Sequence, residues 1–232
     1  MDRTMFRECR ALLFDFGGTI DSDGEHWLDR FFGLYENGGL DFDRGEIKGA
    51  FYHADARCHA DPVVPSLGFR PFVHRHVDFQ FEALDVRDPE KRGRLADRFC
   101  ERAEYFFFHR AGLLDRLKSR FRLGIVSNFF GNLKIVFEEA GLMPSVEAIV
   151  DSGCVGVSKP DPRIFEIALD QLRLPPGHVA FVGDSYERDM MPSTQLGMKT
   201  IWLKGPSPRV PENATPVDAI ITRLSELEVL VR

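Results

Sequence analysis

Short apolar runs that end in polar residues recur along the chain and predict the strands of a sheet. The first run covers residues 11–15, ends at Asp15, and is followed at once by Gly17-Gly18-Thr19. An apolar run of this length that opens into a glycine-rich turn is typical of a buried parallel strand. Four further runs of this kind cover residues 122–127, 146–151, 178–184 and 198–203.

Segments with helical periodicity lie between or after these runs. They cover residues 131–141, 161–173, 186–196 and 222–231. Strands that alternate with helices at this spacing indicate a parallel sheet with helices on both faces. The fold class that we predict is therefore α/β, with a Rossmann-like parallel sheet as its core.

Residues 21–108 interrupt this alternation and predict a helical insert directly after the first strand. They hold 12 of the 21 Phe and five of the seven His. We predict that residues 1–20 and 109–232 form the core domain and that residues 21–108 form an α-helical cap. Ligands of open α/β sheets bind beyond the carboxyl ends of the strands, so the cap would cover that crevice. The expected cap helices cover residues 25–36, 44–59, 70–84 and 89–108.

The composition is that of a folded globular protein and excludes several classes of partner. Apolar residues make up 44% of the 232 residues and charged residues 28%, which is ordinary globular usage. The net charge of −6 provides no field that would attract nucleic acid or an anionic membrane. The four Cys are widely spaced, and no apolar run is long enough for a membrane span or a signal peptide. We expect a cytoplasmic protein that is a monomer or a homodimer.

Polar residues follow the predicted strands in an order that suggests a site. Asp15 ends the first strand, Ser127-Asn128 ends the second, Lys159 follows the third, and Asp184 and Asp189 follow the fourth. Each residue alone has an ordinary structural explanation, such as a turn or a helix cap. Because the carboxyl ends of parallel strands meet at one edge of a sheet, we expect these side chains to converge there.

Four segments of the chain resemble the motifs of the haloacid dehalogenase superfamily, in the subgroup whose helical cap follows the first motif. In chain order they are LLFDFGGTIDSDG, LGIVSN, GVSKPDPRIFEIAL and VAFVGDSYERDMMPSTQLGMKTIWL. The resemblance covers nearly the whole chain and implies a hydrolase whose nucleophile is Asp15. It favours a phosphatase of a small phosphorylated metabolite that forms an aspartyl-phosphate intermediate.

The same resemblance implies Mg²⁺ as the cofactor. The side chains of Asp15 and Asp184 and the backbone carbonyl of Gly17 would be metal ligands, with Asp189 orienting metal-bound water. Lys159 would neutralise the nucleophile and the phosphate, so the expected catalytic residues are Asp15, Lys159 and Asp184. The expected phosphate-binding groups are Lys159, Ser127, Asn128 and the turn residues Gly18 and Thr19.

Gly17 departs from the phosphatase pattern of this family. The family's phosphatases carry a second Asp at this position, two residues after the nucleophile, which protonates the leaving group. Loss of a positioned acid costs roughly 10²–10⁴-fold in rate, so restoring Asp here is expected to accelerate alkyl phosphate hydrolysis. Aryl and acyl phosphates need the acid least. The residues that could replace it are Asp21, Asp23, His26 and His53, of which His26 and His53 are also expected to contact the substrate.

Two other functions are compatible with a glycine at this position. A phosphonate or a carbon–halogen bond needs no acid there, and the phosphonate reaction would require a cap lysine, for which Lys48 is the candidate. Alternatively, a catalytically weak protein could bind a phosphorylated ligand without turning it over. The cap also holds His53, Asp55, Cys58 and His59 on one helical segment and His74 and His76 further on, which could form a metal site or line the substrate pocket. Three cap arginines, Arg57, Arg70 and Arg75, could bind a second anionic group of a substrate.

Overall fold

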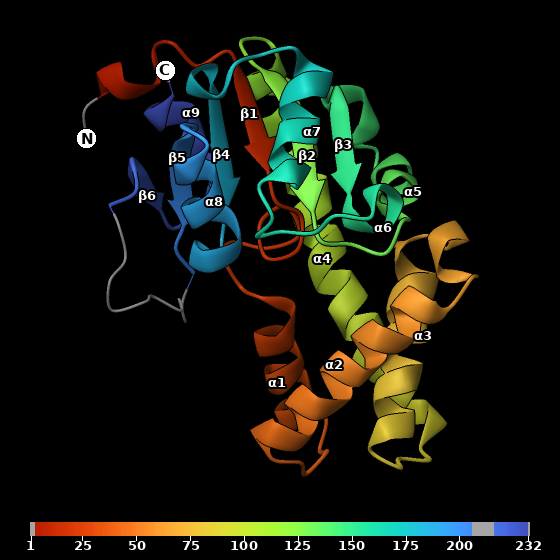
Figure 1. The fold of residues 1–232 in the computed structure, drawn as a ribbon. Helices are drawn as coiled ribbons and strands as arrows, with labels where there is room; N and C mark the ends of the chain where they lie inside the picture. Colours follow the sequence, from red (N-terminus) through yellow and green to blue (C-terminus); the bar gives the residue numbers. More distant parts are fainter. Residues whose placement is uncertain (1–2, 206–215, 232) are drawn as a thin grey trace.

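A six-stranded parallel sheet forms the core of the part of the chain that the computed structural model describes, residues 3–205 and 216–231 (Figure 1). Its strands are ordered β3-β2-β1-β4-β5-β6. This arrangement confirms the predicted Rossmann-like α/β fold. The strands are Ala11–Phe14 (β1), Arg122–Ser127 (β2), Ala148–Asp151 (β3), Val179–Gly183 (β4), Lys199–Leu203 (β5) and Ala219–Ile221 (β6).

Alternating residues of β1 enter the two apolar layers that cover the sheet. Leu12 and Phe14 belong to the cluster that α5 completes, whereas Ala11 and Leu13 belong to the cluster that α7 completes. Both faces of the sheet are therefore buried, which explains why the strands read as continuous apolar runs. The helices after β2 are Leu133–Glu139 (α5), Ser152–Val155 (α6), Arg163–Leu172 (α7), Met191–Gln195 (α8) and Leu227–Leu230 (α9), with a π-helix at Tyr186–Met190.

The C-terminal segment differs from its prediction. The sequence predicts a helix over residues 222–231, whereas the structure has a 3₁₀ turn at Leu224–Glu226 followed by the short α9. Strand β6 was not predicted, because it is three residues long and its central Ile220 is half exposed. It therefore lacks the apolar run that marks the other five strands.

Four helices follow the first strand and lie beyond the carboxyl ends of the strands (Figure 1). Asp43 and Glu46 start the second of them with a capping box, in which each side chain accepts the other residue's N–H at 2.8 Å. The fourth continues from this helical unit into the core, so the predicted domain boundary after residue 108 falls inside a helix. The helices are Trp27–Asn37 (α1), Arg44–Ala60 (α2), Phe69–Ala83 (α3) and Pro89–Lys118 (α4).

The Phe residues of segment 21–108, called the cap below, build its interior. Phe31 stacks on Phe99 with ring centroids 4.7 Å apart, and Phe51 and Phe72 are buried in the same cluster. Interlocked aromatic rings supply much of the apolar area that a small helical unit needs. Among the described helices, none combines the length and the apolarity needed to cross a membrane.

Candidate functional site

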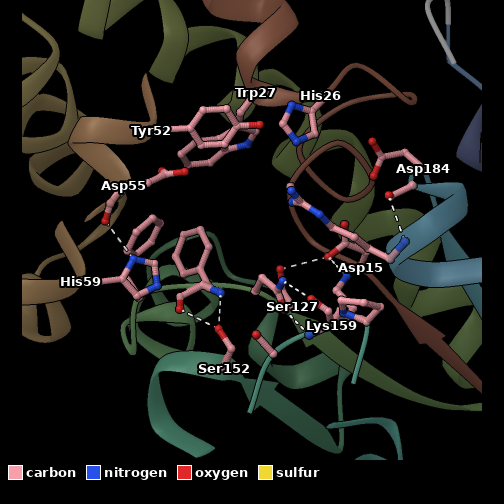
Figure 2. Close-up of a pocket in the computed structure, with 18 of the residues that line it drawn as sticks. Asp15, His26, Trp27, Tyr52, Asp55, His59, Ser127, Ser152, Lys159 and Asp184 are labelled. Atoms are coloured by element: carbon pink, nitrogen blue, oxygen red, sulfur yellow. Dashed lines mark hydrogen bonds and ion pairs between the residues drawn. The ribbon is translucent and has the colours of Figure 1, made fainter. Parts of the chain in front are cut away.

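A cavity of about 490 Å³ separates the carboxyl ends of the strands from the cap (Figure 2). Asp15, Ser127, Lys159 and Asp184 line its core side, as the sequence predicts. Phe51, Tyr52, Asp55 and His59 of α2 line the opposite side, together with His26 and Trp27 at the start of α1.

Asp15 presents one carboxylate oxygen to two donors from neighbouring strand ends. Oγ of Ser127 donates to Oδ1 of Asp15 at 3.0 Å, and Nζ of Lys159 lies 2.7 Å from the same atom. Ser127 is the last residue of β2, which pairs with β1, so the sheet register brings it to Asp15. With Oδ1 fixed, the second oxygen of the carboxylate is the one available to react.

Lys159 is buried between two carboxylates. Its Nζ lies 2.7 Å from Asp15 Oδ1 and 2.7 Å from Asp189 Oδ1. Burial lowers the pKa of Lys159, but the two carboxylates outweigh burial and hold that pKa above its usual value. Asn128 fixes the backbone here, because its side chain accepts from the Lys159 N–H at 2.7 Å and donates to the Lys159 carbonyl at 2.9 Å. In this conformation the Asn128 side chain positions Lys159.

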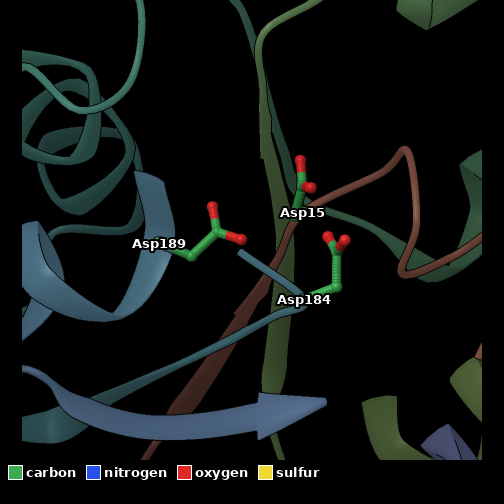
Figure 3. A group of neighbouring side chains, drawn as sticks. All are labelled: Asp15, Asp184 and Asp189. Atoms are coloured by element: carbon green, nitrogen blue, oxygen red, sulfur yellow. The ribbon is translucent and has the colours of Figure 1, made fainter. Parts of the chain in front are cut away.

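Asp15, Asp184 and Asp189 form a compact carboxylate cluster (Figure 3), in which one oxygen from each residue lies within 4.8 Å of the other two. Burial and the two neighbouring carboxylates raise the pKa of Asp184 well above its usual value. Burial also raises the pKa of Asp189 to about 6, although Lys159 opposes this shift. Two buried carboxylates and the partly buried Asp184 against one ammonium group leave excess negative charge, and Mg²⁺ prefers such oxygen donors. The residues therefore fit a bound Mg²⁺.

The two later carboxylates are engaged differently. Asp189 uses both oxygens, since Oδ1 accepts from Lys159 Nζ at 2.7 Å and Oδ2 accepts from the Ser185 N–H at 3.0 Å. Asp184 receives one long hydrogen bond, from Thr19 Oγ1 at 3.5 Å. Asp184 is thus better placed to ligate a metal directly, and Asp189 to hold Lys159.

Two backbone N–H groups that the sequence predicts as phosphate donors form hydrogen bonds within the turn after β1 instead. The Gly18 N–H donates to Asp21 Oδ1 at 2.7 Å, and the Thr19 N–H donates to the Phe16 carbonyl at 3.1 Å. Gly17 lines the cavity, and none of the described hydrogen bonds is donated by its N–H. Of these three turn residues, Gly17 is the one that lines the cavity, whereas Gly18 and Thr19 use their N–H groups within the turn.

The indole of Trp27 lies over Gly17. A Cβ placed on Gly17 would be 3.2 Å from Trp27 Nε1, which is closer than ordinary van der Waals contact. Trp27 Nε1 donates to Asp21 Oδ2 at 2.6 Å, and Arg30 Nη1 lies 3.2 Å from the same carboxylate oxygen. Burial raises the pKa of Asp21, although Arg30 and the two hydrogen bonds that the carboxylate accepts oppose this shift. A buried network therefore holds an aromatic ring against the position from which a side chain at residue 17 would extend.

Replacing Trp27 by Phe is expected to lower the free energy of unfolding by about 2 kcal/mol, because a buried hydrogen bond to a charged group is lost. Urea denaturation measures this change. Trp202→Phe is the matched control, since Trp202 Nε1 donates at 2.9 Å to a neutral acceptor, the Asp184 carbonyl. Its cost should be about 1 kcal/mol. A Trp27→Phe cost no greater than the control's would contradict a charged Asp21 network.

The four candidates for the missing acid lie in different places. Asp21 is buried in the network below Trp27, and Asp23 is held by Arg110 Nη2 at 2.6 Å. His53 is exposed and does not line the cavity. His26 does line it, and its Nδ1 accepts from the Leu28 N–H at 3.2 Å, so a neutral ring carries its proton on Nε2. Of the four, His26 is the one placed in the cavity wall as a proton donor.

Of the remaining cap candidates, only Asp55 and His59 are among the described residues that line the cavity. Arg57, Arg70 and Arg75 form ion pairs with Glu82, Glu104 and Asp61 respectively, and Lys48 is exposed. Asp55 and His59 do line the cavity, whereas Cys58 is buried. In the described part of the chain, the carboxylates at the strand ends are the group that could hold a metal, and no such group lies in the cap.

Several cavity residues were missed by the sequence reasoning. Half of them are aromatic, and an aromatic residue in an amphipathic segment gives no signal that separates a cavity wall from a core. Arg188 lies one residue before Asp189 and is exposed at the cavity. A charged residue in a turn is common, so the sequence offered no reason to select Arg188. The missed aromatic residues are Trp27, Phe51, Tyr52, Phe129 and Phe130.

A parallel sheet with a catalytic-type set of polar residues at its carboxyl ends defines the class as an α/β enzyme. A family model described as haloacid dehalogenase-like hydrolase matches residues 9–197. The chain therefore belongs to the haloacid dehalogenase-like hydrolase family, as the sequence motifs predicted.

Known proteins that resemble this chain include hydrolases of several kinds. Haloacid dehalogenase-like hydrolase domain-containing protein 3 of Bos taurus is 35% identical over 47% of this chain and 45% of its own length. Pyrimidine 5'-nucleotidase YjjG of Escherichia coli is 35% identical over 51% of this chain and 53% of its own length. The matches thus span about half the length of these relatives. A crystal structure of a dehalogenase superimposes with a TM-score of 0.64 at 21% identity over 97% of each chain, which shows a shared fold.

Proposed function

We propose that the protein is a Mg²⁺-dependent phosphatase that transfers the phosphoryl group of a small phosphorylated metabolite to Asp15. The observation that supports this most is the environment of Asp15 itself. Ser127 and Lys159 hold one of its oxygens, and the other is left for attack. A carboxylate fixed in this way can act as a nucleophile toward phosphorus.

The proposed reaction has two steps. The free oxygen of Asp15 attacks phosphorus, the bond to the leaving oxygen breaks, and that oxygen departs with the electron pair. Water then cleaves the aspartyl-phosphate, which releases phosphate and restores the carboxylate. Lys159, in contact with both Asp15 and Asp189, neutralises charge that the phosphoryl group brings into the site. When bound by Asp15, Asp184 and the Gly17 carbonyl, Mg²⁺ would supply further charge neutralisation.

The geometry over Gly17 favours substrates whose leaving group departs without protonation. The indole of Trp27 stands there and is held by Asp21. Of the four candidate acids, His26 is the one that lines the cavity and could act in its place. We therefore place aryl and acyl phosphates ahead of alkyl phosphates as substrates.

The other reactions compatible with a glycine at this position have less support. Among the described residues that line the cavity, Lys159 is the only lysine, and it is already paired with Asp15 and Asp189. No described lysine of the cavity wall is therefore available to form the Schiff base that phosphonate cleavage would need. A carbon–halogen reaction uses the nucleophile but not the cluster that Asp184 and Asp189 complete.

A cytoplasmic location and a monomeric or dimeric state stay predictions.

Steady-state hydrolysis of p-nitrophenyl phosphate and β-glycerophosphate tests the proposal. We expect turnover of the aryl ester with Mg²⁺, loss of that turnover in EDTA, and its return with excess Mg²⁺. The aryl ester should react at least about 10²-fold faster than the alkyl ester, because only the alkyl leaving group needs an acid. Activity that EDTA does not change, or no turnover across a broad phosphate panel, would contradict the phosphatase proposal.

A further inference from the structure

A chain of buried polar side chains crosses the cap and ends at the cavity. Tyr35 Oη donates to Gln80 Oε1 at 3.1 Å, and Gln80 Nε2 lies 2.9 Å from His76 Nδ1. His76 Nε2 in turn lies 2.9 Å from Oδ1 of Asp55, which lines the cavity. Tyr35, His76 and Gln80 are completely buried. Such a series of buried polar groups is costly to assemble in an apolar interior unless each group has its hydrogen-bond partners.

The direction of each hydrogen bond follows from its partners. Burial raises the pKa of the Tyr35 phenol, so this group keeps its proton and donates to the Gln80 carbonyl oxygen. The Gln80 amide nitrogen then faces His76 Nδ1 as a donor, which leaves the His76 proton on Nε2, directed at Asp55. A neutral His76 orients Asp55 without cancelling its negative charge.

No described Lys or Arg side chain forms an ion pair with Asp55. The nearby cap arginines are used elsewhere, Arg57 by Glu82 and Arg75 by Asp61. His59 Nδ1 lies 2.8 Å from the backbone carbonyl of Asp55 and must donate to it, so Nε2 of the neutral ring is an acceptor. The cap end of the cavity therefore presents acceptors and a negative charge (Figure 2).

The space between this end and Asp15 is lined by aromatic rings. Trp27 and Phe129 are 6.0 Å apart between ring centroids, Phe129 and Phe130 are 5.4 Å apart, and all three line the cavity with Phe51 and Tyr52. Aromatic faces accommodate flat apolar groups and also attract cations. The cavity thus has a phosphate end, an aromatic middle and an anionic far end.

We propose that Asp55, oriented by His76, Gln80 and Tyr35, recognises a cationic group on the leaving-group side of the substrate. The substrate class is then a phosphate monoester whose aryl or other flat leaving group carries an ammonium group. This proposal rests on the phosphatase function proposed above. Asp55 acts here as a specificity-determining residue that contacts the substrate away from the reacting atoms.

Two matched esters test the proposal: 4-(aminomethyl)phenyl phosphate and its uncharged isostere 4-ethylphenyl phosphate. In the wild-type protein, kcat/KM should favour the ammonium ester about five- to tenfold, as expected for a partly buried ion pair with aromatic support. Asp55→Asn should abolish this preference, while it keeps an acceptor for His76. Glu101→Gln removes a charge from the exposed surface of α4, away from the cavity lining, and should leave the preference unchanged.

Binding of the corresponding phosphonates separates the two proposals, because these analogues do not turn over. A wild-type Kd that favours the ammonium analogue, lost in Asp55→Asn, supports the specificity role even if no ester is hydrolysed, which would overturn the phosphatase proposal alone. No preference in the wild type, or a preference that survives in Asp55→Asn, would overturn the role of Asp55. Asp55→Ser gives the same test if the Asn variant does not fold.

Discussion

Replacing Asp15 by Asn is expected to reduce Mg²⁺-dependent phosphatase activity by at least about 10⁴-fold, as loss of a covalent nucleophile does in other hydrolases. The amide is a poor nucleophile, and it also removes one of the carboxylates that would ligate Mg²⁺. Initial rates with p-nitrophenyl phosphate measure the loss. The fold should persist, because Lys159 keeps its ion pair with Asp189.

The control for this variant is Asp170→Asn, which removes a carboxylate from the exposed face of α7. It should retain full activity. Unchanged thermal unfolding of both variants would show that the loss arises at the reacting atoms. If folded Asp15→Asn protein kept more than about a hundredth of the activity, Asp15 would not be the nucleophile and the two-step reaction would have to be abandoned.

The strand-end residues of the site could be predicted because sheet topology alone brings them together. Asp15 follows β1 and Ser127 ends β2, and the pairing of these strands puts the two side chains within a hydrogen bond. Lys159 and Asp184 follow the next two core strands in the chain and reach the same edge. Predicting this part of the site requires only a correct strand assignment and the rule that the carboxyl ends of parallel strands lie at one edge of the sheet.

The cap side of the site could not be predicted in this way. The contact between Trp27 and Gly17 depends on how α1 leaves the turn after β1, and the chain from Tyr35 to Asp55 depends on the packing of three helices. Helical periodicity indicates which face of each helix is apolar, but it does not indicate which residues of different helices contact one another. The sequence could therefore place the excess of Phe and His in the cap, but it could not tell which of these residues line the cavity and which pack in the interior.

The structure also changes what is expected from restoring the acid at Gly17. From the sequence, Gly17→Asp alone should accelerate alkyl phosphate hydrolysis. The new Cβ would lie 3.2 Å from Trp27 Nε1, and that nitrogen is held by its hydrogen bond to Asp21 at 2.6 Å. Because the carboxylate would need the space that the indole fills, the single variant should gain no more than a few-fold.

The double variant Gly17→Asp with Trp27→Leu is expected to hydrolyse β-glycerophosphate about 10²–10⁴-fold faster than Trp27→Leu alone, the range for a positioned general acid. Leucine keeps an apolar contact with Phe99, whose ring centroid is 4.7 Å from that of Trp27, while it vacates the position of the indole nitrogen. Hydrolysis of p-nitrophenyl phosphate should change far less, because that leaving group departs without a proton. The ratio of the β-glycerophosphate rate to the p-nitrophenyl phosphate rate measures the contribution of the introduced acid.

Each possible result leads to a different conclusion about the missing acid. A full gain in Gly17→Asp alone would mean that the indole yields easily and does not exclude an acid. No gain in a folded double variant would mean that another residue already protonates the leaving group, and His26 is the cavity residue whose Nε2 carries the proton to do so. A gain confined to the double variant would identify Trp27, and not the missing side chain alone, as the reason that alkyl esters react slowly.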